Sequence, residues 1–227
     1  MPELRKELHS PAPKRAAAAL CLSPVYYFAL SFVLRGIGLS AFAANMIFFS
    51  VGISVSLALF FPFLRESFSL LRAEPRRVFH ALMLGGILHY GGLALVASVM
   101  LRLGIAPQTE NNAIVLEMTR RAPAAMLLFS VVAAPITEEC LFRGAVFAQL
   151  RKKSRFAAYA VTALGFALVH AAPGMAAGHM EDAFGSLVYI PPSVALCFAY
   201  EYSGTIWTSI FLHGAINAAS YILVFLI

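Results

Sequence analysis

Two adjacent glutamates, Glu138 and Glu139, stand in a stretch of sequence that is otherwise apolar. Residues 123–136, just before them, are apolar apart from Ser130, and Arg143 follows four residues after Glu139. A charged side chain at the centre of a bilayer costs about 2.5–3.5 kcal/mol on insertion scales, so such residues usually serve a function. A carboxylate held away from water can act as a general base, and the pair therefore indicates a catalytic site.

The two glutamates are expected to have different roles. Glu139 and Arg143 are i and i+4 on one helix, so their side chains can pair along one face. Glu138 is rotated by about 100° from Glu139 and faces elsewhere. We therefore expect Arg143 to neutralise Glu139, whereas Glu138 stays unpaired and faces the bundle interior as the general base.

His170 is the predicted neighbour of Glu138. Glu138 lies fifteen residues before Lys153, and His170 lies fifteen residues after Arg155. In an antiparallel helical hairpin that turns near Ser154, both side chains would lie about 22 Å from the turn. They are therefore expected at equal depth.

The last apolar segment carries a second histidine motif. His213 and Asn217 are i and i+4, so they project from one helix face. An imidazole and an amide directed at one point could stabilise a developing oxyanion. Phe166 is likewise four residues before His170 and is expected to pack against the site. His89 has no matching partner, and we interpret it as structural.

The composition defines the elements that must position these residues. Sixty per cent of the residues are apolar and only 12% are charged, which is typical of a polytopic membrane protein. The 227 residues suffice for about seven or eight spans of roughly 20 residues each, so the predicted fold is an all-α transmembrane bundle. The expected spans cover about residues 18–35, 39–63, 79–101, 122–150, 156–171, 184–200 and 205–227.

The spans divide the chain into a basic N-terminal segment (1–15), N-terminal transmembrane helices (16–121) and a catalytic core (122–227). A polar, mildly amphipathic connection is expected over residues 102–121. Prolines are expected to shape two spans: residues 173–174 would end the fifth, and the proline pair 191–192 would kink the sixth.

The positive charges orient the bundle. With a cytoplasmic N-terminus, inner segments hold twelve Lys and Arg residues and outer segments hold four, with Arg143 left out. Cytoplasmic loops of membrane proteins carry such an excess. The net charge of +6 therefore reflects membrane orientation, and nucleic acid is not an expected partner. The expected location is a bacterial inner membrane, with the lipid bilayer as a partner.

The spacings described above form three motifs in order: EExxxR at residues 138–143, FxxxH at 166–170 and HxxxN at 213–217. Their types and order resemble those of the CAAX-processing and bacteriocin-processing protease family (CPBP, also called Abi). Members of this family are intramembrane glutamic endopeptidases. The resemblance covers about residues 122–227 and implies an α-helical bundle that hydrolyses a peptide bond without a covalent intermediate.

The resemblance also implies a role for each motif residue. It implies two catalytic pairs and a supporting pair: Glu138 with His170 to activate water, His213 with Asn217 to hold the oxyanion, and Arg143 to fix Glu139. The implied substrate is a membrane-anchored protein or peptide, and no cofactor is implied.

Two alternatives use the same buried groups. A carboxylate and two histidines could bind zinc, which would make the protein a membrane metalloprotease. The chain lacks HExxH, the usual helical zinc signature, so no metal ligand is predicted. The groups could also serve a non-catalytic immunity or transport protein. A transporter would be expected to contain inverted repeats, and the sequence shows none.

Overall fold

The protein is an all-α bundle. The computed structural model describes residue 4 and residues 7–226, and the regular structure of this part is entirely helical. The predicted segment 1–15 and the end of the predicted core, 122–227, therefore lie partly outside the described residues. Seven stretches of the described chain are long and apolar enough to cross a membrane: Pro13–Leu34, Phe42–Ala73, Pro75–Arg102, Pro123–Arg151, Arg155–Ala176, Asp182–Ser203 and Ile206–Leu226. The prediction of a polytopic helical bundle is confirmed.

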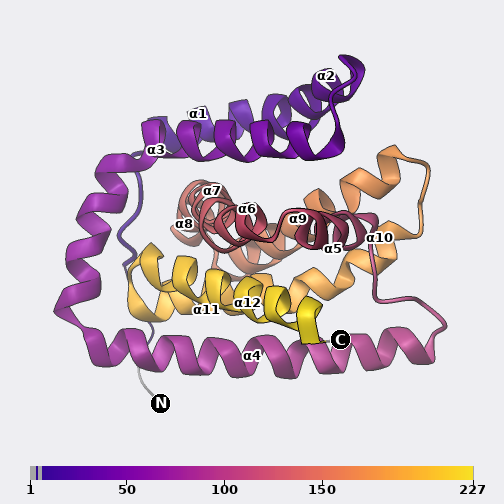
Figure 1. Cartoon of the computed structure of the whole chain (residues 1–227). Helices are drawn as coiled ribbons and strands as arrows, with labels where there is room; N and C mark the ends of the chain where they lie inside the picture. The colour runs from indigo at the N-terminus through magenta and orange to yellow at the C-terminus, as the bar shows by residue number, and fades with distance from the viewer. Residues whose placement is uncertain (1–3, 5–6, 227) are drawn as a thin grey trace.

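The N-terminal helices lie around those of the C-terminal half (Figure 1). The first stretch contains α1 (Pro13–Pro24), the π-helical η1 (Val25–Leu30) and α2 (Ser31–Gly36). It is followed by α3 (Ala41–Ala73) and α4 (Pro75–Arg102), whose ribbons run along two sides of the molecule. The helix α3 continues for ten residues beyond the end of the expected span 39–63, because no helix breaker occurs between Pro62 and Glu74-Pro75.

A polar helix joins the two halves. The expected connection over residues 102–121 contains α5 (Glu110–Arg121), which the Thr109 side chain caps by accepting a hydrogen bond from the Asn112 N–H at 3.3 Å. Pro123 then begins the next helix at a position where a missing N–H costs nothing.

The C-terminal half carries all three motifs. One span is a continuous helix made of α6 (Pro123–Leu128), η2 (Phe129–Ala133), α7 (Ala134–Glu139), η3 (Cys140–Phe147) and α8 (Ala148–Arg151), in which η2 and η3 are π-helical. It is followed by α9 (Arg155–Ala176), the short α10 (Asp182–Gly185), the 3₁₀-helical η4 (Ser186–Tyr189), α11 (Ile190–Ser203) and α12 (Ile206–Leu226).

The prolines act differently from the prediction. Pro173 lies inside α9, which continues to Ala176, so the span does not end there. Pro191 and Pro192 stand in the first turn of α11, where they begin a helix and do not kink one. The reason is that the first helical N–H groups have no intrahelical acceptor, so proline loses nothing at that position.

A buried carboxylate joins the basic ends of the C-terminal helices. Glu201 is fully buried, and its oxygens accept hydrogen bonds from Arg151 Nε, from Arg155 Nε at 3.1 Å and from the Tyr159 hydroxyl at 2.8 Å. The N-terminal segment lies at the same end, because Gln149 Nε2 donates to the Pro11 carbonyl at 3.0 Å. Two of the basic segments counted above therefore meet at one end of the bundle.

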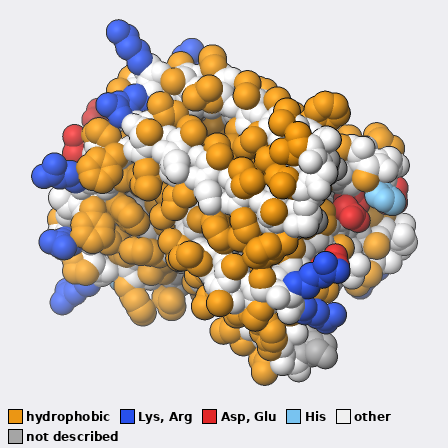
Figure 2. Space-filling model, turned by 45° about the horizontal axis from the view of Figure 1, so that its top comes forward, with side chains coloured by type: hydrophobic (Ala, Val, Ile, Leu, Met, Phe, Trp, Pro, Cys, Tyr) orange, Lys and Arg blue, Asp and Glu red, His pale blue; other side chains and the backbone are white. Residues whose placement is uncertain are grey.

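The outer surface suits a lipid environment. Large apolar side chains are widely exposed; Phe32, for example, is 79% exposed and Phe156 is 84% exposed. Figure 2 shows hydrophobic side chains over most of one face, with Lys and Arg gathered at its edges. Soluble monomers rarely expose apolar patches of this extent, whereas membrane proteins must.

Candidate active site

The glutamate pair stands between two π-helical segments. Glu138 and Glu139 end α7, which lies between η2 and η3. Wide π-turns within α-helices occur frequently at functional sites. The Glu139 side chain is completely buried, whereas that of Glu138 is 18% exposed. The pair therefore divides as predicted, with one carboxylate inside the protein and one facing a cavity.

Glu139 links two charged or polar partners. Arg143 Nη1 donates to Glu139 Oε1 at 3.1 Å, which confirms the predicted pair, and both side chains are fully buried. Nδ1 of His213 lies 2.8 Å from the same oxygen. A carboxylate that is paired with a guanidinium is an acceptor, so His213 Nδ1 carries the proton of this hydrogen bond. Glu139 thus orients His213 as well as Arg143.

Arg143 is held on its other side by α11. Its Nη2 donates to both the carbonyl oxygen and the Oγ of Ser193, each at 3.0 Å. Its guanidinium carbon also lies 5.0 Å from the centre of the Phe166 ring, within range of a cation–π contact. The cation therefore joins three spans, and Phe166 packs against the site as predicted.

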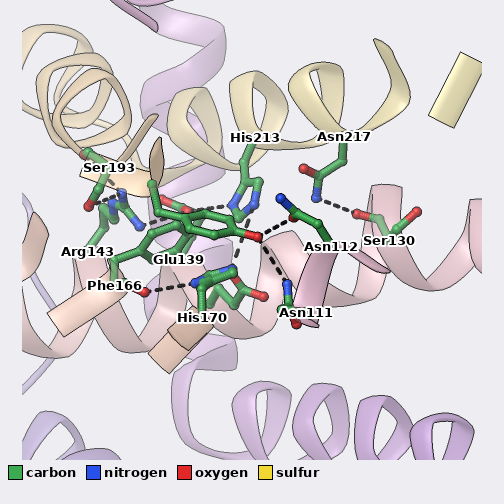
Figure 3. Close-up of polar contacts among 12 residues, drawn as sticks. Asn111, Asn112, Ser130, Glu139, Arg143, Phe166, His170, Ser193, His213 and Asn217 are labelled. Atoms are coloured by element: carbon green, nitrogen blue, oxygen red, sulfur yellow. Dashed lines mark hydrogen bonds and ion pairs between the residues drawn. The ribbon is translucent and has the colours of Figure 1, made fainter. Parts of the chain in front are cut away.

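His170 presents one defined nitrogen to the site. Its Nδ1 lies 2.8 Å from the Phe166 carbonyl oxygen, which can only accept, so Nδ1 carries a proton. This leaves Nε2 as the basic nitrogen of the neutral ring. Figure 3 shows His170 and His213 entering the same region from α9 and α12.

Glu138 lies between the two histidines. Its Oε2 is 4.0 Å from His170 Nε2 and 3.9 Å from His213 Nε2. The predicted neighbourhood of Glu138 and His170 is therefore confirmed. Both distances are too long for direct hydrogen bonds, and a polar contact of this length can be bridged by one water molecule.

Asn217 lies on the same face of α12 as His213, as predicted. Its Nδ2 donates to the Ser130 carbonyl in η2 at 2.8 Å (Figure 3). One amide hydrogen is thus used to fix the side chain, and the second remains available to a ligand. The role of Asn217 and His213 in holding an oxyanion stays a prediction.

The site opens into a large apolar cavity of about 1540 Å³. Glu138, His170, His213 and Asn217 contribute to its lining. Further lining residues come from the N-terminal half and from α5, among them Tyr27, Phe48, His89, Asn112 and Met118. This volume exceeds that of most small-molecule sites, and it could take an extended polypeptide or an apolar chain.

The sequence did not indicate several residues that complete the site. Tyr189 stacks on His170, Ser193 binds Arg143, and Asn111 and Asn112 contact the Tyr189 hydroxyl. Only Asn111 and Asn112 had a signal in the sequence, as two adjacent amides in the polar connection.

In the described part of the chain, no group of three or more His, Cys, Asp or Glu side chains has the arrangement of a metal site.

Gly214, next to His213, sets the approach of α12 to η2. A Cβ at this position would lie 2.8 Å from the Val131 carbonyl oxygen, a main-chain atom that cannot rotate away. We predict that Gly214→Ala lowers the unfolding free energy by about 1–3 kcal/mol, because the overpacked helix must shift. Thermal unfolding in detergent measures this change.

Gly86→Ala is the matched control, since its added Cβ would have no atom within 4 Å apart from its chain neighbours and the backbone of its own helix. Its stability should stay equal or rise by up to about 1 kcal/mol through helix propensity. Equal stability of the two variants would show that the α12–η2 contact is looser than the structure indicates.

Comparison with known proteins agrees with the motifs. Residues 120–219 match the family described as type II CAAX prenyl endopeptidase Rce1-like. A protein of Bacillus subtilis (strain 168) named "Putative membrane peptidase YdiL" is 30% identical over 115 residues, which cover 50% of this chain and 43% of that protein. This match thus spans less than half of the relative's length. No solved structure matches the chain. The predicted resemblance is confirmed for the matched segment.

Proposed function

We propose that this multi-pass membrane protein is an intramembrane endopeptidase. It hydrolyses a peptide bond in a membrane-associated protein or peptide. The match of residues 120–219 to the type II CAAX prenyl endopeptidase Rce1-like family supports this proposal. The observation that carries this proposal is the position of Glu138 Oε2, which faces Nε2 of both His170 and His213 at 4.0 and 3.9 Å.

Glu138 and His170 activate the attacking water. Two hydrogen bonds of about 2.8 Å that meet at one oxygen near a right angle separate their partners by about 4 Å, which is the spacing seen here. Glu138 takes a proton from this water as its oxygen bonds to the substrate carbonyl carbon. The same proton then passes to the leaving amine as the C–N bond breaks. Because the nucleophile is water and not a side chain, no covalent enzyme intermediate forms.

His213 and Asn217 stabilise the oxyanion of the tetrahedral intermediate. The buried Glu139 carboxylate, 2.8 Å from His213 Nδ1, stabilises positive charge on that ring, so Nε2 can donate to the oxyanion. The amide hydrogen of Asn217 that is not used on Ser130 is the second donor. Arg143 holds Glu139 in this position and does not touch the substrate.

The substrate enters from the apolar cavity. Because the cavity is lined by both halves of the bundle and is mainly apolar, it suits a polypeptide that is itself anchored in the bilayer. We propose a bacterial inner membrane as the location of the protein. The basic segments at one end follow the distribution of cytoplasmic loops, which supports an N-terminus in the cytoplasm. No metal takes part in this mechanism.

The experiment compares His170→Ala with His179→Ala in the protein reconstituted in liposomes. The probes are quenched fluorescent peptides that carry an apolar anchor, and assays run with and without a zinc chelator. We expect His170→Ala to lower the turnover number about 100-fold, because it removes one of the groups that orient water.

His179 is the matched control, since it is exposed and, among the described residues, its ion pair is with the exposed Glu181 of the same loop at 3.4 Å. Its substitution should leave turnover unchanged. Loss of activity in the chelator would support the metalloprotease alternative, and the absence of any cleavage by the wild-type protein would support a binding or transport role.

A further inference from the structure

Tyr189 contacts His170, although it belongs to none of the three motifs. It ends η4, and its ring stacks on His170 with the centroids 4.0 Å apart and the planes at 29°. Phe166 contacts the imidazole as well, with a centroid distance of 4.4 Å. Two aromatic rings thus restrict the rotamers that His170 can adopt.

The Tyr189 hydroxyl is anchored on α5. It accepts a hydrogen bond from Asn111 Nδ2 at 3.2 Å and donates one to Asn112 Oδ1. Figure 3 shows both asparagines directed toward the region of the two histidines. Because the phenol both accepts and donates, its far end has a defined position as well as its ring.

The first turn of α5 is itself fixed. The main-chain N–H of Glu110 donates to Oδ2 of the buried Asp182 at 2.7 Å, and Thr109 caps the helix. From this turn α5 runs along the cavity, which Val115 and Met118 help to line. A continuous set of contacts therefore leads from α10, through α5 and Tyr189, to His170.

We propose that Tyr189 is a positioning residue: it stacks on His170, its hydroxyl is hydrogen-bonded to the asparagine pair of α5, and it thereby fixes the orientation of the His170 ring. This role rests on the proposed function, in which His170 Nε2 orients the attacking water with Glu138. Tyr189 acts through His170 and not on the substrate. A misplacement of about 1 Å in a catalytic group can lower turnover about 100-fold, so the effect appears in kcat and not in KM.

Tyr189→Leu, which removes the stacked ring, should lower kcat about 100-fold and leave KM within about twofold, measured with the peptides described above. Tyr189→Phe keeps the ring and loses only the anchor, so its loss of kcat should be smaller, about fivefold, as expected when one hydrogen bond is removed. Asn112→Ala breaks the same anchor from the other side. The kcat of the double variant Tyr189→Phe/Asn112→Ala should therefore be no lower than that of the less active single variant.

A second measurement does not depend on substrate. The ring signals of ¹⁵N-labelled histidine, recorded in detergent micelles and assigned with His170→Ala, report the tautomer of His170. The wild-type protein and Tyr189→Phe should show the Nδ1–H tautomer, whereas Tyr189→Leu should give averaged or broadened signals. Tyr159→Phe, which loses a hydrogen bond to Glu201 away from the cavity, should leave both the signals and kcat unchanged.

The outcomes separate the two proposals. Unchanged His170 signals and unchanged kcat in Tyr189→Leu would overturn the positioning role, even if the protein is a protease. If Tyr189→Leu does not fold, additive losses in Tyr189→Phe and Asn112→Ala would overturn it instead. If no peptide is cleaved by the wild-type protein but the His170 signals respond to Tyr189→Leu, the proposed function fails and the positioning role stands.

Discussion

Glu138→Gln is expected to lower the rate of peptide hydrolysis by about 10⁴-fold while the protein stays folded. The amide has nearly the shape of the carboxylate, but it cannot take a proton from water at neutral pH. Glu138 is partly exposed to the cavity and makes no hydrogen bond through Oε2, so the packing of α7 should not change. The measurement is single-turnover cleavage of the anchored peptides, together with thermal unfolding of the same preparation.

Glu181→Gln is the matched control for this prediction. Glu181 is exposed in a loop, and its ion pair in the described part of the chain is with the exposed His179, so its amide variant should keep full activity. Cleavage by Glu138→Gln at a rate near that of the wild-type protein would show that another group is the base. Loss of folded protein in Glu138→Gln would instead give Glu138 the supporting role assigned to Glu139.

Arg143→Met is expected to have the largest effect on stability. The Arg143–Glu139 pair is completely buried, so removal of the cation leaves a buried carboxylate whose charge is no longer compensated. Breaking such a pair typically costs about 3–5 kcal/mol. We therefore expect a loss of this size in the unfolding free energy in detergent, and a loss of activity because His213 is no longer oriented through Glu139.

An exposed pair of the same spacing gives the control. Arg121 Nη2 lies 2.6 Å from Glu117 Oε1, with side chains 74% and 62% exposed, so Arg121→Met should change stability by about 1 kcal/mol or less. The double variant Arg143→Met/Glu139→Gln should recover part of the stability, because it removes both charges. A loss in Arg143→Met that is no greater than that in Arg121→Met would contradict the buried pairing.

The site and the cavity have different origins in the chain. The motif residues all lie within the segment 120–219 that matches the Rce1-like family. Part of the cavity wall, including Tyr27, Phe48 and His89, lies before that segment. His89, interpreted from the sequence as structural, lines the cavity while buried on α4. In the proposed function, this part of the wall would contact the substrate although it lies outside the matched segment.

Contacts within one helix or one hairpin could be predicted from the sequence. The Glu139–Arg143 pair follows from i, i+4 spacing, and the approach of Glu138 to His170 follows from equal distances to a basic turn. Both depend only on the rise and rotation per residue of an α-helix, which are nearly independent of tertiary context. Even the π-helical η3 leaves Arg143 within reach of Glu139.

Contacts between helices that are distant in sequence could not be predicted. The hydrogen bond from His213 to Glu139 depends on how far α12 is rotated toward α7, and the stacking of Tyr189 depends on η4. In a bilayer, hydropathy does not distinguish a helix face that contacts protein from one that contacts lipid, because both are apolar. No periodic signal therefore marked these residues.

The sequence by itself determined that seven or eight apolar helices would carry a glutamate pair, two histidines and an asparagine at membrane depth. It also separated Glu138 from Glu139, because the two side chains leave a helix about 100° apart. Only the tertiary structure decided that Glu139 holds His213 as well as Arg143, and that Tyr189 ties His170 to α5. The spacing of residues along a helix is set by local backbone geometry, whereas the packing of one helix against another is set by side-chain shape and by buried polar pairs.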